Sequence, residues 1–439
     1  MVFTNGNVYT MDSANTYYFS GYIREQDGLI LEIGDMKDFK KKPGEVEKNL
    51  EGRIVIPGMI TGHSHFYAQF ARGISGLEPI ETWQHTLTRL WWKLDRKLTM
   101  KQCYYSAMMG LIEGIKSGTT LFFDHQASPS CIDGVMDVLA EAVRQTGARA
   151  ALSYEVTDRN GKEGAVAGIR ENERFIQKCM QNPSDQIRPM IGLHAIYSVE
   201  EDTLEACAQI GKDTDTGFHI HVAEGMADET ESYRRYDENI IAHLKRSGIL
   251  NPKSIAAHGV CISESEIDIF QTTGATLAYN GLSNANSGVG IAPVVSILEH
   301  GGHAVFGGDG FTSDMFHEIS VDILLQRLKA GSPAVFTGNQ IHQMLYEDNQ
   351  RLTENVFGKQ AGVLKTGSFA DFLVIEYDSP TPLLETNIMA HLTSAFSGKI
   401  KMTVAGGKIV VQDGHCTLVD EQEVFAHCRE EAAKLWKSI

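Results

Sequence analysis

The sequence predicts an α/β protein: a (β/α)8 TIM barrel with a small β-sandwich domain formed by both chain ends. Strand-like apolar runs alternate with helical segments through the middle of the chain, which is typical of a parallel sheet. Eight such units over about 300 residues fit a barrel better than an open sheet, because barrels typically have about 250 residues or more. Short β-prone runs with turn dipeptides, such as Asn5-Gly6 and Asp27-Gly28, precede the barrel, and similar runs follow it.

The two β-rich flanks are expected to share one domain. Residues 1–55 and 361–418 would form the sandwich, and residues 56–360 the barrel. Residues 419–439 would form a C-terminal helix packed on the body. That helix is predicted from apolar residues at helical spacing, namely Val424, Phe425, Cys428, Leu435 and Trp436.

The eight barrel strands are expected to end in polar or ionisable residues. In a barrel of this kind, chemistry gathers at the carboxyl ends of the strands. The predicted strands are Ile54–Gly62, Thr120–Asp124, Ala148–Glu155, Pro189–His194, Gly217–Val222, Ser254–His258, Ala275–Asn280 and His303–Asp309. The residues at or beside their ends are His63, His65, Asp124, Glu155, His194, His221, His258, Asn280 and Asp309.

Composition excludes several classes of protein. The 439 residues are 42% hydrophobic and 22% charged, which is ordinary for a globular chain. The formal net charge of −17 opposes long-range attraction to nucleic acid or to an anionic membrane, so neither is expected as a partner. Seven scattered cysteines without a CxxC pair indicate free thiols in a reducing compartment. With no signal-like N-terminus and no long apolar run, we expect a soluble, cytoplasmic protein.

Two HxH pairs and an aspartate predict a metal site. His63-Ser64-His65 can project both imidazoles to one face of a strand, and His219-Ile220-His221 repeats the pattern. Within the second pair, His219 lies deeper in the strand and is the better candidate for a packed core histidine. Three of these imidazoles and the Asp309 carboxylate form a ligand set suited to one divalent metal, with Zn²⁺ favoured over Fe²⁺. The fourth strand ends in His194, so no lysine is available there to bridge two metals.

Glu224 and His258 are the candidates for proton transfer. Glu224 follows His221 by three residues, and His258 ends the sixth strand. A divalent metal lowers the pKa of water toward neutrality, and a carboxylate and a histidine suit the proton movements that follow. The alternatives are a solvent-exposed helical position for Glu224 and a packed core position for His258. For Asp124, Glu155 and His194, a role in the site and a structural hydrogen bond are weighed equally.

Other hydrolase and nucleotide-binding motifs are absent from the sequence. His317-Glu318 has Val321 where an HExxH motif needs its second histidine, and the PCxxC signature of small zinc deaminases does not occur. There is no P-loop, no GxGxxG after a strand and no nucleophile elbow.

These motifs together resemble the amidohydrolase superfamily, in its metal-dependent aminohydrolase branch. Within that branch the closest resemblance is to the SsnA-like aminohydrolases, through Leu90–Arg96, Asp124–Pro129 and Asp378–Leu384. The resemblance rests on Ile56–Ile60 leading into His63–Phe66, on His219–Glu224, Ala257–Val260 and Gly308–Gly310, and on the late Gly367–Phe372. It implies that His63, His65, His221 and Asp309 hold one metal per chain. It also implies that Glu224 passes a proton to a substrate ring nitrogen and then to the leaving group. His258, with Asp309, would orient and deprotonate the water.

The resemblance further implies substrate contacts. The segment Asn280–Asn284 matches an N-P-x-S-N run of the family, except that Gly281 replaces the proline. An aromatic loop after the first strand could stack on a planar ring. The substrate-binding candidates are His194, Phe66, Gln84, Trp83, Glu155, Asn280 and Ser283.

The expected function is hydrolytic deamination of a nitrogen heterocycle, with release of ammonia. The resemblance favours an amino- or oxo-purine, or a pteridine, as the small-molecule substrate. Two alternatives keep the metal site but change the bond: ring opening of a cyclic amide, and hydrolysis of a halide or another leaving group. A third alternative is a non-catalytic metal-binding assembly protein. Relatives are often dimers or larger, so we expect a homo-oligomer.

Overall fold

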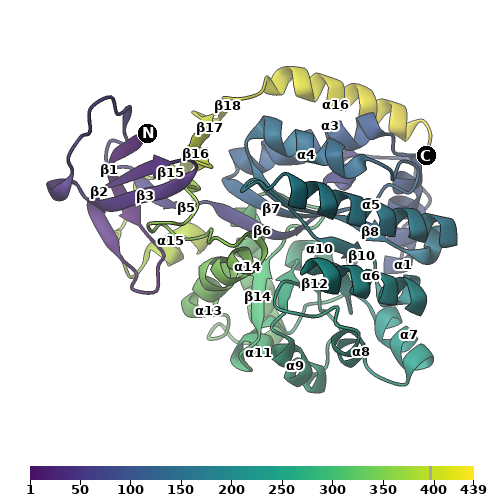
Figure 1. The fold of residues 1–439 in the computed structure, drawn as a ribbon. Coiled ribbons are helices and arrows are strands. Elements are labelled where there is room, and N and C mark those ends of the chain that lie inside the picture. Colours follow the sequence, from purple (N-terminus) through teal and green to yellow (C-terminus); the bar gives the residue numbers. More distant parts are fainter. Residues whose placement is uncertain (395–397) are drawn as a thin grey trace.

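The computed structural model describes residues 1–394 and 398–439 and contains two sheets (Figure 1). In the first sheet the described strands all pair in parallel, and helices surround the sheet (Figure 1). Its path runs, in chain order, through β6 (Met59–Ser64), β7 (Thr119–Gln126), β8 (Arg149–Val156), β10 (Ile191–Leu193), β11 (Phe218–Val222), β12 (Ile255–His258), β13 (Thr276–Tyr279) and β14 (His303–Phe306), with β9 (Ile187–Pro189) beside β8.

The two ends of this path close onto each other just after β6 and β14. Ser64 forms a parallel bridge with Asp309, and the N–H groups of Gly308 and Asp309 both donate to the His63 carbonyl at 3.0 Å. The N–H of His65 donates to the Asp309 carbonyl at 3.2 Å. Closure therefore brings the carboxyl end of the first barrel strand against the loop that follows the last one.

Helices cover the outside of the barrel and also form its loops. The helices are α1 (Trp83–Thr86), α2 (Trp92–Leu94), α3 (Met100–Lys116), α4 (Val135–Thr146), α5 (Lys162–Gln181), α6 (Glu201–Thr214), α7 (Met226–Tyr236), α8 (Ile240–Arg246), α9 (Glu264–Phe270), α10 (Gly281–Ser287), α11 (Val294–Glu299), α12 (Met315–Ala330), α13 (Gly338–His342) and α14 (Asp348–Phe357). Among the described residues, no helix has the combination of length and apolar character that a membrane span requires.

The second sheet is largely antiparallel and uses both ends of the chain. Its order is β18-β17-β16-β15-β5-β1-β2-β3, with β4 paired to β1. Side chains from both ends share one core, in which the rings of Phe3 and Phe372 meet edge to face at 4.8 Å. The strands are β1 (Val2–Tyr9), β2 (Tyr17–Gln26), β3 (Leu29–Asp35), β4 (Glu47–Asn49), β5 (Ile54–Pro57), β15 (Phe372–Glu376), β16 (Lys399–Ala405), β17 (Lys408–Gln412) and β18 (His415–Cys416).

The prediction of a single barrel strand over Ile54–Gly62 is wrong. The chain breaks at Gly58 into β5, which belongs to the second sheet, and β6, which belongs to the barrel. A Cβ atom on Gly58 would lie 2.3 Å from Thr120 Oγ1, so only glycine lets the backbone pass this close to β7 while it changes sheets. The predicted barrel and the separate sheet are themselves confirmed.

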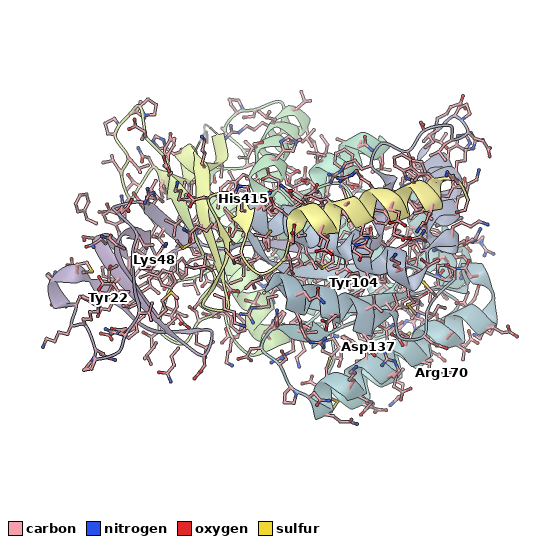
Figure 2. All side chains as sticks on the ribbon, turned by 90° about the horizontal axis from the view of Figure 1, so that it is seen from above. Tyr22, Lys48, Tyr104, Asp137, Arg170 and His415 are labelled. Carbon is pink, nitrogen blue, oxygen red and sulfur yellow. The ribbon has the colours of Figure 1, made fainter. Side chains whose placement is uncertain are left out.

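The last helix, α16 (Glu421–Trp436), lies along the barrel on α3 (Figures 1 and 2). The Cys428 thiol donates to the Tyr105 carbonyl at 3.2 Å, and Trp436 Nε1 donates to the Phe70 carbonyl at 2.7 Å. In Figure 2, Tyr22 and Lys48 mark the second sheet, whereas Tyr104 lies on the barrel side. The short helix α15 (Ile388–Ser394) completes the described elements.

Candidate active site

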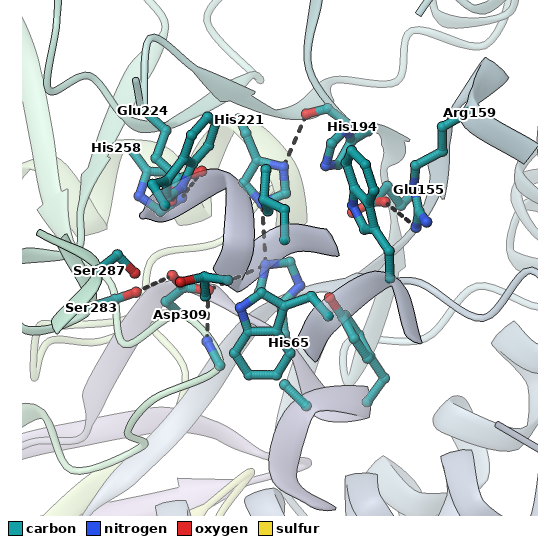
Figure 3. Close-up of a pocket in the computed structure, with 18 residues that line it drawn as sticks. His65, Glu155, Arg159, His194, His221, Glu224, His258, Ser283, Ser287 and Asp309 are labelled. Carbon is teal, nitrogen blue, oxygen red and sulfur yellow. Dashed lines mark hydrogen bonds and ion pairs between the residues drawn. The ribbon is translucent and has the colours of Figure 1, made fainter. Parts of the chain in front are cut away.

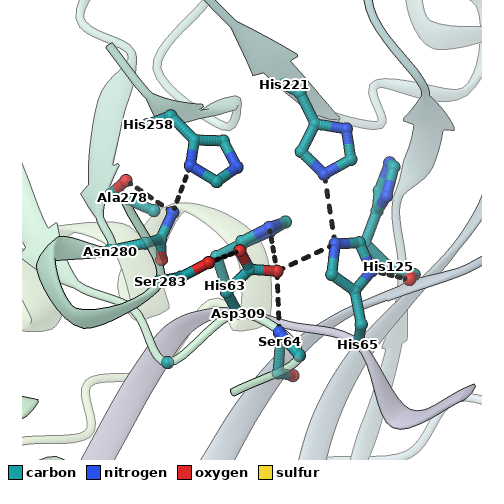
Figure 4. Close-up of polar contacts among 12 residues, drawn as sticks. His63, Ser64, His65, His125, His221, His258, Ala278, Asn280, Ser283 and Asp309 are labelled. Atoms are coloured by element: carbon teal, nitrogen blue, oxygen red, sulfur yellow. Dashed lines mark hydrogen bonds and ion pairs between the residues drawn. The ribbon is translucent and has the colours of Figure 1, made fainter. Parts of the chain in front are cut away.

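The four residues predicted to hold a metal meet at the carboxyl end of the barrel (Figure 4). His65 Nε2 lies 3.1 Å from His221 Nε2 and 3.3 Å from Asp309 Oδ1, and His63 Nε2 lies 3.7 Å from the same Asp309 oxygen. Ligand atoms that share one ion at about 2.1 Å are typically about 3 to 3.5 Å apart. The spacing of the four side chains therefore fits one small divalent metal.

Hydrogen bonds to the second nitrogen of each imidazole orient the rings. His65 Nδ1 bonds to the His125 carbonyl at 2.6 Å, and His221 Nδ1 bonds to the His194 carbonyl at 2.9 Å. Each bond requires the proton on Nδ1 and leaves Nε2 as the free donor atom, which is the usual arrangement around a metal.

His63 shows the same arrangement with a side-chain partner. Its Nδ1 lies 2.7 Å from His219 Nε2. His219 therefore orients the proposed ligand His63 and is not one of the four proposed ligands itself. His63 Nε2 is buried and has no hydrogen-bond partner among the described residues. An unsatisfied buried nitrogen facing a carboxylate is explained by a bound cation, so the residues present fit a metal.

The charges of the group also suit a metal. Burial lowers the pKa of His63, His65 and His221. Neighbouring imidazoles lower the pKa of His63 and His221 further, whereas Asp309 raises the pKa of His65 without outweighing burial, so the three rings are neutral. Burial raises the pKa of Asp309, but His65, His258 and the Ser283 hydroxyl outweigh burial and leave that pKa lowered, so the carboxylate stays ionised. Neutral imidazoles and an ionised carboxylate are the forms that bind a metal.

The backbone takes a strained turn where the side chains enter the site. Ala223 (φ 49°), His258 (φ 80°) and Asp309 (φ 54°) all have left-handed backbone, which residues other than glycine rarely adopt. They follow or end strands β11, β12 and β14. Such strain persists where surrounding structure enforces it and often marks functional sites.

Glu224 and His258 face each other across the mouth of the site (Figure 3). Glu224 Oε2 lies 3.9 Å from His258 Nε2, and Glu224 Oε1 accepts a 2.9 Å bond from Trp83 Nε1. Burial raises the pKa of Glu224, which favours a carboxyl group able to take up and release a proton. Burial lowers the pKa of His258, but the carboxylates of Glu224 and Asp309 outweigh it and leave that pKa raised.

The loop after β13 supports both His258 and Asp309. His258 Nδ1 donates to Asn284 Oδ1 at 2.8 Å, and the Ser283 hydroxyl donates to Asp309 Oδ2 at 2.5 Å. Asn280 is fully buried, with Nδ2 3.5 Å from His258 Nδ1. Asn280 therefore lies behind His258 and does not line the cavity.

Gly281 is explained by the packing under this loop. A Cβ atom on Gly281 would lie 1.7 Å from Asp322 Oδ1, so the missing side chain makes room for a buried carboxylate of α12. Glu318, one turn earlier on α12, accepts the N–H of Leu282 at 3.1 Å. The departure from the family's proline thus coincides with two acidic side chains that support the loop from below.

A cavity of about 580 Å³, including its open mouth, lies over these residues (Figure 3). Of the predicted substrate-binding residues, Trp83, Glu155, His194 and Ser283 line it. Phe66 instead packs in the core against Phe122, and Gln84 is exposed, so neither lines the cavity. The other lining residues are His65, Tyr67, Ala68, Thr86, Leu87, Trp91, Trp92, Arg159, His221, Glu224, His258, Ser287, Asp309 and Gly310.

His125 and Arg159 are among the residues of the site that were not predicted from the sequence. His125 lies among the rings of the metal-site histidines, 4.8 Å from that of His221, because β7 continues two residues beyond Asp124. Asp124 points to the opposite face of the strand and accepts the Phe66 N–H. The Asp124-His125 pair at a strand end was the available signal, because adjacent strand residues face opposite sides.

Arg159 also was not predicted, and it reaches the cavity from the loop after β8. Its side chain is only 7% exposed; one end forms an ion pair with Asp95 and lies 3.5 Å from Glu155 Oε1. Its Nε and Nη1 atoms are buried and have no hydrogen-bond partner among the described residues. Burial raises the pKa of Glu155, but His194, His125 and Arg159 outweigh it, so Glu155 is ionised. No sequence pattern predicted a role for Arg159, because the path of the loop after β8, and not a strand end, brings its side chain to the cavity.

Comparison with known proteins identifies relatives over nearly the whole chain. The 5′-deoxyadenosine deaminase of Methanosarcina mazei is 28% identical over 442 residues, which cover 99% of this chain and 98% of the relative. The 5-methylthioadenosine/S-adenosylhomocysteine deaminase of Bacillus cytotoxicus is 29% identical over 434 residues, which cover 97% of this chain and 97% of the relative.

Solved structures share the fold. An adenosine deaminase from Xanthomonas campestris with bound zinc superposes with a TM-score of 0.88, at 17% identity, over 100% of this chain and 98% of that chain. A model of the Amidohydrolase family matches residues 54–410, which include the barrel strands, the four proposed metal ligands and both proton-transfer candidates. Because this match spans most of the sequence, the chain belongs to the amidohydrolase family.

Proposed function

We propose that the protein is a metal-dependent hydrolytic deaminase that replaces the exocyclic amino group of a purine-type ring with oxygen and releases ammonia. The observation that carries the proposal is the pairing of Glu224 with His258 at the mouth of the metal-binding group, 3.9 Å apart. Neither side chain is needed merely to hold a metal. The names of the relatives, deaminases of adenosine derivatives, support the same reaction.

The chain's own residues divide the proton movements. A divalent metal held by His63, His65, His221 and Asp309 would supply a water nucleophile by lowering the pKa of that water. The bond from His258 Nδ1 to Asn284 leaves His258 Nε2 as a proton acceptor facing the site. Glu224, with its raised pKa, would protonate the ring nitrogen beside the reacting carbon and then the departing amine.

The remaining cavity wall suits a nucleoside. Trp83, Trp91 and Trp92 offer faces and edges on which a planar ring can rest. Farther along the wall lie the ionised carboxylate of Glu155 and the guanidinium of Arg159. A carboxylate accepts from hydroxyl groups and a guanidinium donates to oxygen, so this pair would hold polar groups distant from the reacting carbon. We therefore favour an adenine nucleoside with a modified 5′ position, as in the relatives' substrates.

The test is ammonia release by zinc-loaded protein from a panel of adenine nucleosides, free amino-purines, pterins, cytosines and aminotriazines. Glu224→Gln serves as the blank, because it keeps the size of the side chain and should keep the metal. We expect release from the nucleosides and a loss of turnover of at least about 100-fold in the variant.

A second set of cyclic amides, assayed for ring opening, distinguishes the closest alternative. Ring opening without ammonia release would replace deamination as the reaction while keeping the same site. Equal turnover by Glu224→Gln and wild type would contradict the role assigned to Glu224.

A further inference from the structure

Two cysteine side chains lie against each other behind the candidate active site. Cys103 Sγ and Cys131 Sγ are 3.8 Å apart, although 28 positions separate them in the chain. Cys103 is fully buried near the beginning of α3, whereas Cys131 is partly exposed in the loop between β7 and α4. We propose that Cys131 is an oxidant-reactive thiol and that Cys103 resolves it, forming a reversible disulfide within the chain.

The surroundings of Cys131 favour its thiolate. The pair lies at the beginning of α3, where the helix dipole favours negative charge. A hydrogen bond from Cys103 lowers the pKa of the Cys131 thiol, and the Ser128 and Ser130 hydroxyls lower it further, against the opposing effect of burial. The same contact and burial raise the pKa of Cys103. The more exposed thiol is thus the better nucleophile, and its neighbour stays protonated until it reacts.

The geometry allows the bond to form by a small movement of the loop. A disulfide holds its sulfurs about 2.0 Å apart, so the two atoms must approach by roughly 1.8 Å. Cys103 is held in a helix, whereas Cys131 belongs to residues 127–134, which lie between β7 and α4 without a helix or strand of their own. In the reduced protein the Cys131 thiol lies 3.3 Å from the Leu98 carbonyl, besides its contact with Cys103.

The chemistry balances with a peroxide as oxidant. The Cys131 thiolate attacks a peroxide oxygen, the O–O bond breaks, and the products are a sulfenic acid and, after protonation, water. Cys103 then attacks the Cys131 sulfur, the S–S bond forms, the S–O bond breaks, and the Cys103 proton leaves with the hydroxide as a second water. Two thiols are oxidised and one peroxide is reduced.

The disulfide would form beside residues that border the active site. Gln126 Nε2 donates to Cys103 Sγ at 3.5 Å, and Gln126 follows His125 on β7. The Ser130 hydroxyl, adjacent to Cys131, bonds to the Leu98 carbonyl at 2.6 Å and to the Asp95 carbonyl at 3.3 Å. Asp95 forms an ion pair with Arg159, which lines the cavity. The oxidised loop would therefore contact a residue that holds part of the cavity wall.

The test treats the reduced, full-length protein with hydrogen peroxide, blocks the remaining thiols with iodoacetamide and digests with trypsin. Cleavage after Lys101, Lys116 and Arg144 puts Cys103 alone in residues 102–116 and Cys131 alone in residues 117–144. We expect these two peptides to be recovered as one linked species that dithiothreitol separates. Cys131 should also react with iodoacetamide at least about 10-fold faster than Cys179, because burial raises the pKa of the Cys179 thiol to about 11.

Matched variants assign the two roles. Cys103→Ser should leave Cys131 as a sulfenic acid that dimedone traps, Cys131→Ser should form neither the adduct nor the link, and Cys179→Ser should behave as wild type. The proposal is overturned if the wild-type protein, still folded, gives no linked species, or if Cys131 reacts no faster than Cys179. The wild-type measurement does not depend on whether a variant folds, and it is independent of the proposed reaction.

Discussion

Trp83 donates a 2.9 Å hydrogen bond from its indole nitrogen to Oε1 of Glu224, joining the loop after the first barrel strand to the candidate acid just after the fifth. Both side chains line the cavity. The bond fixes one carboxylate oxygen and leaves the other directed toward His258. A residue expected to stack on the substrate therefore also orients the proposed proton carrier.

Replacing Trp83 by phenylalanine should lower kcat/KM by about 10-fold, because a hydrogen bond to a charged group is lost. Burial already raises the pKa of Glu224, and the Trp83 bond lowers it, so Trp83→Phe should raise that pKa further. The measurement is the pH profile of kcat/KM, in which the limb assigned to Glu224 should move to higher pH. Trp91→Phe, at another cavity tryptophan, is the control and should leave that limb in place. If that limb of the pH profile did not move in Trp83→Phe, the hydrogen bond from Trp83 would not control the pKa of Glu224.

Removing His219 should weaken metal binding without removing a ligand. His219 Nε2 lies 2.7 Å from His63 Nδ1 and holds the ring that presents Nε2 to the metal. Loss of such a supporting contact typically costs about 10- to 100-fold in metal affinity. Competition with a chromogenic chelator should show this loss in His219→Phe, whereas the exposed His317→Ala should match wild type. An unchanged metal affinity in His219→Phe would show that His219 only packs in the core and does not support the metal site.

Asp309→Ala should abolish both metal retention and activity. Asp309 supplies the only carboxylate within the proposed four-residue ligand group, 3.3 Å from His65 Nε2. Without it, three neutral imidazoles remain and the charge of the ion is no longer balanced. Metal analysis after dialysis should find less than about one tenth of the wild-type content. A variant that retained metal and turnover would exclude Asp309 from the ligand group.

Arg159→Lys should raise KM for a nucleoside by about 10-fold and change kcat less than about threefold. The lysine keeps the charge toward Asp95 but loses the planar guanidinium that Arg159 contributes to the cavity wall. Steady-state kinetics of the proposed deamination would measure the split. Arg170→Lys, at an exposed position on α5, is the matched control. Equal KM values for Arg159→Lys and wild type would place the substrate elsewhere on the wall.

The buried carboxyl of Glu318 should make stability fall as pH rises. Burial raises its pKa from 4.5 to about 8, so between these values the folded protein keeps a proton that the unfolded chain has released. The contribution is complete below about pH 4.5 and is lost as pH rises through about 8. The Glu318→Gln variant cannot ionise at this position. Between pH 5 and pH 8 the wild-type protein should therefore lose roughly 2 to 4 kcal/mol more of its free energy of unfolding than the variant does.

Denaturant unfolding at several pH values provides the comparison. Glu299→Gln, an exposed position on α11, should follow the wild-type curve. If Glu318→Gln and wild type lost stability in parallel, the ionisation of Glu318 would not be the cause.

Local patterns were sufficient for the barrel and for the core of the site. Alternation of strand and helix depends on the spacing of apolar residues, and a polar residue at a strand end must lie at the barrel mouth. His63, His65, His221 and Asp309 were therefore predicted together, and the structure brings them within a few ångströms. Phe66 and Gln84 also follow the first strand, but their loop turns one into the core and the other to solvent.

The sequence by itself determined the fold class, the proposed ligands and the Glu224–His258 pair, because each depends on periodicity along one strand and on the shared direction of parallel strands. Only the tertiary structure decided the rest. Arg159 meets Glu155 and Asp95, Asp322 fills the space that Gly281 leaves, and Cys131 reaches Cys103 through loop paths between elements. A loop has no repeating pattern, so its residues acquire neighbours only when the elements it connects have packed.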